Sequence, residues 1–201
     1  MNITMQISAL LLSLLPEGFT PVGEAQVEVD GRAAILSRAE RSDGTNRGIG
    51  GEHVSTVVSE DGILLGFTRM TREMAASAEL PSDDVARDIA MDFLDRHAPD
   101  LLDAHKVHWI APHNETITVN RQGNVEKITL TGMKVKMRST NSDRLWFWVI
   151  VGPDEEVMVF ERDIFWVNMP GHRRTEHWLQ DSWLLQQDRP EVKELETAGN
   201  G

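Results

Sequence analysis

The chain contains no cysteine and no tyrosine, and its first lysine or arginine is Arg32. Without cysteine it forms no disulfides, offers no thiolate ligand to a metal and has no cysteine nucleophile. Its stability must therefore come from a packed core. A length of 201 residues, of which 40% are hydrophobic, suffices for such a core and predicts one or two globular domains.

The late first basic residue bears on the apolar run from Ile7 to Leu15. A signal peptide normally opens with a basic segment, which is missing here. The run also has apolar residues at helical spacing, which is typical of an amphipathic helix packed on a core. We therefore expect a cytoplasmic protein, or an exported one if residues 1–25 are a signal peptide. No other apolar run is long enough to cross a membrane.

Acidic residues outnumber basic ones by 32 to 20, which gives a formal net charge of −12. This charge favours solubility and repels a phosphate backbone, so we expect no nucleic-acid partner. Basic residues alternate along an expected strand and could form a local patch there, although a solvated strand face is the commoner arrangement. They are Arg121, Lys127, Lys134, Lys136 and Arg138.

A hairpin-like pattern occurs twice, about ninety residues apart. The first copy spans residues 54–67 around the turn Ser59-Glu-Asp-Gly62, and the second copy spans residues 145–160. Each copy follows an amphipathic helical stretch. The repetition predicts two related helix-plus-sheet units, at 1–75 and 80–168.

The clearest helix begins at Ser82, whose side chain can cap the free amides of the first turn. An apolar stripe runs from there to about His97, where a proline soon ends the helix. A C-terminal helix is predicted at 175–187, with Thr175 as its cap. The polar residues 188–201 predict a disordered tail.

Strand-like segments fill most of the remaining chain. The alternation of side chains between Thr129 and Arg138 is what a half-buried antiparallel strand requires. The turn Asp30-Gly31 predicts a hairpin, because glycine accepts the positive φ of a two-residue turn. We therefore predict an α+β fold in which helices pack on antiparallel sheet.

One family resemblance rests on two segments. Ser59-Glu-Asp-Gly-Ile-Leu64 and Leu80-Pro-Ser-Asp-Asp-Val-Ala-Arg-Asp-Ile-Ala-Met-Asp-Phe-Leu94 resemble the turn and the helix of PepSY-like domains. The resemblance implies two cystatin-like or PepSY-like units that are noncatalytic, often exported, and sometimes proposed to restrain peptidases or to bind envelope partners. The resemblance assigns no catalytic residues to this chain. PepSY-like domains are often exported, and the chain differs from them in having no recognisable export signal.

No motif of an enzyme, metal site or cofactor site stands out. Four histidines fall between His97 and His113, but His105 and His108 point to opposite faces of an extended strand, and no further ligand accompanies them. The chain has no nucleophile elbow, and the glycines at 48–51 precede a strand rather than a helix. We predict no metal and no cofactor, and an enzyme is the less favoured reading.

Tryptophan gives the best indication of a working surface, because six occur and this residue is enriched where recognition energy is concentrated. We predict that a partner or a second protomer binds to the expected C-terminal helix. The alternative is that the same residues cover the chain's own sheet. These residues are Trp178, Leu179 and Trp183, with Arg173 and Arg174 upstream.

The leading hypothesis is a noncatalytic protein-binding or regulatory protein of bacterial type, which restrains or assists a partner protein. It would use a sheet face, the loop 41–51 or the Trp-bearing helix. One alternative is a small-ligand carrier or enzyme with a pocket between helix and curved sheet, lined by Trp146, Trp148 and His108. Another is a self-assembling structural subunit.

Overall fold

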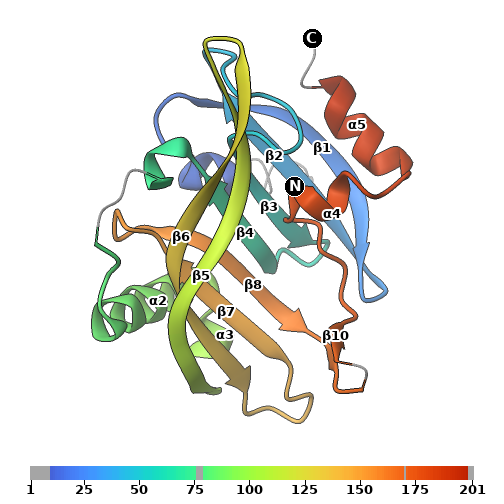
Figure 1. The fold of residues 1–201 in the computed structure, drawn as a ribbon. Coiled ribbons are helices and arrows are strands. Elements are labelled where there is room, and N and C mark those ends of the chain that lie inside the picture. Colours follow the sequence, from blue (N-terminus) through green and yellow to red (C-terminus); the bar gives the residue numbers. More distant parts are fainter. Residues whose placement is uncertain (1–9, 76–78, 170, 199–201) are drawn as a thin grey trace.

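The computed structural model describes residues 10–75, 79–169 and 171–198. Eight antiparallel strands form one sheet in the order β1-β2-β3-β4-β8-β7-β6-β5 (Figure 1). Their bounds are β1 Phe19–Val29, β2 Arg32–Arg41, β3 His53–Ser59, β4 Leu64–Met70, β5 His105–Arg121, β6 Asn124–Ser139, β7 Trp146–Val151 and β8 Val157–Ile164. The short strands β9 (Trp166–Val167) and β10 (His172–Arg173) form a separate two-stranded sheet.

The predicted α+β fold of helices packed on antiparallel sheets is wrong. Strands make up 48% of the structure and helices only 20%, and the helices are few and short. The structure also lacks two separate cystatin-like or PepSY-like sheets. The sections 1–75 and 80–168 each contribute four consecutive strands, but β4 pairs with β8 through Gly66–Glu161, Phe67–Phe160 and Thr68–Val159, so the strands join into one sheet.

Tight turns set the register of the hairpins. Asp30 and Gly31 both have positive φ, 47° and 79°, between β1 and β2, which confirms the predicted hairpin. Gln122 and Gly123 have φ of 54° and 90° at the tip of the long β5–β6 hairpin. Such turns match the right-handed twist of the strands that they join.

One long helix, α2 (Asp83–His97), is present where the sequence predicts it. The Ser82 side chain accepts a hydrogen bond from the amide of Val85, as expected of a cap. The buried side chains of α2 include Phe93 and Leu94, which pack in a core cluster with residues of β6, β7 and β8. The short helices α3 (Pro99–Leu102) and η1 (Arg72–Ala75) complete the connections.

Residues 10–14 are helical, and Leu11 is buried in the same core cluster as α2. Ile7 and the other residues of the apolar run before Leu10 lie outside the described residues. Within the described residues, no helix has the length and apolar character needed to cross a membrane.

The predictions for the C-terminal part are corrected. Instead of a helix at 175–187, only the turn α4 (Asp181–Leu184) is helical, and the expected disordered tail contains α5 (Pro190–Ala198). The tail is ordered because its aliphatic side chains Val192 and Leu195 lie one helical turn apart and are buried in a cluster with residues of β1.

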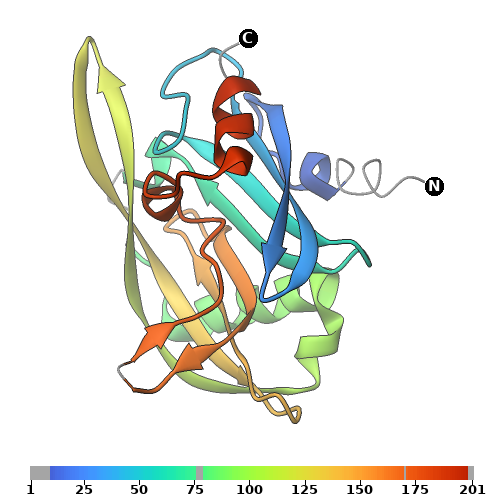
Figure 2. The ribbon, with the colours of Figure 1, turned by 90° about the vertical axis from the view of Figure 1, so that its right-hand side faces the viewer.

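The sheet curls around the C-terminal segment. In Figure 2 the β5–β6 hairpin stands away from the rest of the sheet, and the segment after β8 runs between this hairpin and β1–β2. The face opposite α2 is therefore concave, and the chain's own C-terminal residues cover part of it.

Candidate functional site

The register of β5, β6 and β7 brings cations and indoles together on the concave face. Lys136 on β6 pairs with Trp109 on one side and with Trp148 on the other. Arg138 pairs with Trp146 in the next row. Directly paired residues of neighbouring strands share a face of the sheet, so these side chains are neighbours.

The Lys136 ammonium lies among three indole rings. Its Nζ is 4.5 Å from the ring centroid of Trp146, 5.5 Å from that of Trp109 and 5.6 Å from that of Trp166. Trp166 belongs to β9, so the two-stranded sheet closes one side of this arrangement. These side chains and their neighbours form what is called the Trp–Lys surface below. It consists of Trp109, Lys134, Lys136, Arg138, Trp146, Trp148 and Trp166.

The other two cations of the surface also lie against indoles. Lys134 Nζ is 4.0 Å from the centroid of Trp148, and the Arg138 guanidinium is 4.9 Å from that of Trp146. Each such contact contributes about 0.5–2 kcal/mol, depending on how far the cation is removed from water. Each of the three cations is thus held against at least one indole ring.

Neither lysine of the surface has a carboxylate partner. Within the described chain, Lys134 and Lys136 make no ion pair and no hydrogen bond, and Arg138 donates only to the carbonyl of Arg144. Burial lowers the pKa of the Lys134 amine to about 8, although Glu161 and Glu115 act to raise it. Burial also lowers the pKa of Lys136. Both ammonium groups have therefore lost hydration without forming an ion pair among the described residues.

Arg173 on β10 has a structural role beside the Trp–Lys surface. It forms a buried ion pair with Glu161 at 2.7 Å and donates to the carbonyls of Thr175 and Glu176. Because its charge is already matched, it fixes the strand pair β9–β10 beside the surface rather than offering a free cation.

Two indoles of the Trp–Lys surface reach solvent. Trp109 is 38% exposed and Trp166 is 42% exposed, whereas Trp148 is buried. Large apolar side chains that remain exposed beside unpaired cations are typical of a binding surface.

The residues predicted to line a pocket are brought together, but in a different place. The His108 ring lies 5.1 Å from that of Trp146, and Trp148 lies two residues further along β7 on the same face as Trp146. The predicted pocket between helix and sheet is nevertheless wrong for these residues, because Trp146 and Trp148 alternate away from the α2 face, to which Phe147 and Val149 point.

The residues predicted to meet a partner mostly cover the chain's own sheet. Trp178 and Leu179 are buried, and the Trp178 indole donates to the Glu28 carbonyl at 2.8 Å. Trp183 is half-buried and packs edge-on against Trp178, whereas Arg174 is exposed. In this arrangement a partner reaches Arg174 but not Trp178 or Leu179.

A buried ionic network holds the C-terminal segment on the concave face. Arg38 makes two hydrogen bonds to the Asp181 carboxylate, at 2.9 and 3.0 Å, and a third to Glu40 at 2.8 Å. Burial would raise the pKa of Asp181, but Arg38 and His53 hold it below its usual value. Asp181 also accepts from the Gly50 amide, so the network fixes part of the loop 41–51 as well.

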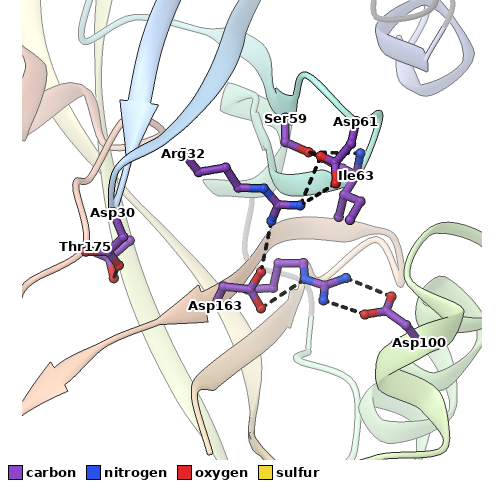
Figure 3. A network of polar contacts seen from close by, with 9 residues as sticks. Asp30, Arg32, Ser59, Asp61, Ile63, Asp100, Asp163 and Thr175 are labelled. Carbon is purple, nitrogen blue, oxygen red and sulfur yellow. Dashed lines mark hydrogen bonds and ion pairs between the residues drawn. The ribbon is translucent and has the colours of Figure 1, made fainter. Parts of the chain in front are cut away.

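A second polar network joins distant parts of the sheet (Figure 3). Arg32 binds both carboxylate oxygens of Asp61 in the β3–β4 turn, at 2.9 and 3.0 Å, and lies 3.7 Å from Asp163. Arg162 pairs with Asp100 of α3 and with Asp163. These carboxylates are matched by arginines, and within the described residues no group of three potential ligands could hold a metal ion.

In the sequence, Lys134, Lys136 and Arg138 are recognisable only as part of a basic strand face, and no pattern singles out Trp109. A register shift of β5 between Val107 and Trp109 sets the face on which Trp109 lies. No local pattern in the sequence indicates this irregularity. The alternation of β6 and β7, by contrast, did indicate which residues share a face.

Comparison of the chain with family models, curated proteins and solved structures finds no match. The resemblance to PepSY-like domains therefore stays a prediction.

Proposed function

We propose that this is a noncatalytic binding protein that recognises a partner protein through the Trp–Lys surface. The observation that supports this most directly is the pair Lys134 and Lys136, two partly desolvated ammonium groups that lie against indole rings and form no ion pair among the described residues. They occur in a chain that carries 32 acidic residues, so intramolecular partners are not scarce.

The exposed indoles give such a surface its affinity. Tryptophan offers a large, rigid contact area at a small cost in conformational entropy, and it often dominates the energy of an interface. The ring centroids of Trp109 and Trp166 lie 5.5 and 5.6 Å from the Lys136 ammonium, so a bound partner would cover apolar and cationic atoms together.

A binding role is better supported than an enzymatic one. The buried titratable groups Arg38, Asp181 and His53 are engaged with one another and with backbone groups. The pKa of the buried His53 is lowered by burial and by the charge of Arg38, which makes the imidazole a poor base.

The test is partner capture with the double variant Trp109→Ala/Trp166→Ala. Proteins bound from an extract of the native host by the immobilised wild-type chain should be lost with the variant. Leu185→Ala is the control, because it removes an exposed apolar side chain elsewhere. Retention of the same proteins by the double variant, with unchanged thermal stability, contradicts the proposal.

A second candidate, a small-ligand carrier, is favoured by a pocket of about 710 Å³ on the α2 face. Its lining includes Phe67, Phe93, Arg96 and His97. This volume is in the range of sites for small molecules. Native mass spectrometry of the purified chain tests this candidate. A bound small molecule should be retained by the wild type and lost on Ile89→Trp, which enlarges a partly buried side chain of the pocket lining.

A further inference from the structure

The three cations of the Trp–Lys surface form a regular row along one strand. Lys134, Lys136 and Arg138 occupy alternate positions of β6 and share the concave face. Alternate residues of a strand are separated by about 6.7 Å along its axis. An extended peptide with carboxylates at alternate positions has the same spacing.

The partner must lie on the face of the sheet rather than extend its edge. β5 is the edge strand beside β6, but Pro112 has no amide to donate, and the amide of Thr118 already donates to the Gly50 carbonyl. Edge pairing is therefore interrupted at two places along β5. The exposed side chains on the face remain as the contact.

The overall charge of −12 does not prevent an acidic partner from binding. At physiological ionic strength the Debye length is about 8 Å, so distant carboxylates are screened, whereas contacts within the row are not. A carboxylate seated over Lys134 or Lys136 also supplies the anion that these half-buried ammonium groups lack.

We infer that the Trp–Lys surface binds an extended acidic segment of a partner protein, with carboxylates at alternate positions over Lys134, Lys136 and Arg138. Methylene groups of the segment contact the flanking indoles of Trp109 and Trp146. This inference rests on the proposed function and names the chemistry of the partner.

The test uses fluorescein-labelled peptides and fluorescence anisotropy at physiological salt. A peptide of four Glu-Ser repeats should bind, and a peptide of four Gln-Ser repeats should not. A peptide with four glutamates followed by four serines has the same charge but the wrong spacing, so it should bind more weakly. Equal affinity for the two acidic peptides contradicts the alternate register.

Substitutions of lysines on β6 test whether the peptide binds at the Trp–Lys surface. Lys134→Gln/Lys136→Gln should weaken binding of the Glu-Ser peptide about tenfold or more, since two charge-assisted contacts are lost. Lys127→Gln is the matched control, because it removes an exposed lysine from the same strand outside the row. Unchanged affinity in the double variant overturns the inference.

An acidic polysaccharide carries similar carboxylates, so trigalacturonate is tested in parallel. Binding of trigalacturonate without binding of the Glu-Ser peptide overturns the inference in favour of a sugar. If no peptide binds but Trp109→Ala/Trp166→Ala still abolishes partner capture, the inference fails and the proposed function stands. If the peptide binds but capture is unchanged in that variant, the proposed function fails.

Discussion

Arg38 and Asp181 are 143 positions apart in the chain and form a buried ion pair. Arg38 is 1% exposed. A buried pair of this kind is weak evidence for net stability, but breaking it leaves an uncompensated charge inside the protein. The pair therefore fixes where the C-terminal segment docks.

Asp181→Asn should destabilise the fold by about 3 kcal/mol, because Arg38 keeps only Glu40 as a charged partner. Urea unfolding followed by circular dichroism measures this loss. Asp188→Asn, which breaks the exposed pair with Lys193, should leave the midpoint unchanged. Equal midpoints for the Asp181 variant and the wild type would show that the ion pair does not hold the segment.

Stability should fall as the pH is lowered below 6.5. Burial and Arg38 lower the pKa of His53 from its ordinary value of 6.5, so at lower pH the unfolded chain binds a proton that the folded chain does not. The pKa values of His97 and His177 are lowered as well. The contribution of His53 is therefore intact above pH 6.5 and is lost as the pH falls towards its folded pKa.

Urea midpoints measured from pH 7.5 to pH 5 check this dependence. His53→Gln should make the stability less dependent on pH, because the proton that only the unfolded His53 binds is removed. A His53 variant with an unchanged slope is inconsistent with the assignment.

The β5–β6 hairpin is the element that shapes the concave face, and Gly132 sits where it approaches β7. A Cβ atom at this position would lie 2.7 Å from Ile150 Cγ2 and 2.8 Å from the Val151 carbonyl oxygen. Both atoms belong to the packed sheet and cannot easily move. The glycine therefore permits close contact between β6 and β7.

Gly132→Ala should destabilise the fold by about 1–3 kcal/mol through overpacking. Thermal unfolding by differential scanning calorimetry measures the effect. Val125→Ala at the exposed hairpin tip, on the same strand, should change the stability little. If the Gly132 variant were as stable as the wild type, β6 would be able to move away from β7 without a loss in the free energy of unfolding.

Elements with their own start and stop signals could be predicted from the sequence, as α2 and the Asp30–Gly31 hairpin show. The predicted helix at 175–187 was wrong because its apolar residues serve contacts with distant strands. Trp178 bonds to Glu28, and Leu179 packs over Gly66. Periodicity reports which residues are apolar, but not which surface buries them.

At the scale of the whole molecule, one sheet and one C-terminal segment connect both halves. The β4–β8 pairing joins the strands, and the Arg32 and Arg162 networks link the β3–β4 turn to β8 and α3. The edges of the sheet are also protected, since α5 lies against β1 and Pro112 interrupts β5.

The two halves should therefore unfold in one cooperative transition. All six tryptophans lie after residue 108, so their fluorescence reports on the second half and the C-terminal segment. Hydrogen exchange of the amides in β1–β4 reports on the first half. The two transitions should coincide in urea, and earlier opening of β1–β4 would show that the halves are independent.

The sequence by itself determined the turns, the capped helix and the alternation that puts Lys136 and Trp148 on definite faces of their strands. These features depend on neighbouring residues, through backbone conformation and side-chain period. Only the tertiary structure decided that the strands form one sheet, that the C-terminal residues lie on its concave face, and that Trp109 and Trp166 flank Lys136. Those outcomes depend on strand pairing and burial between residues far apart in the chain, which no local pattern specifies.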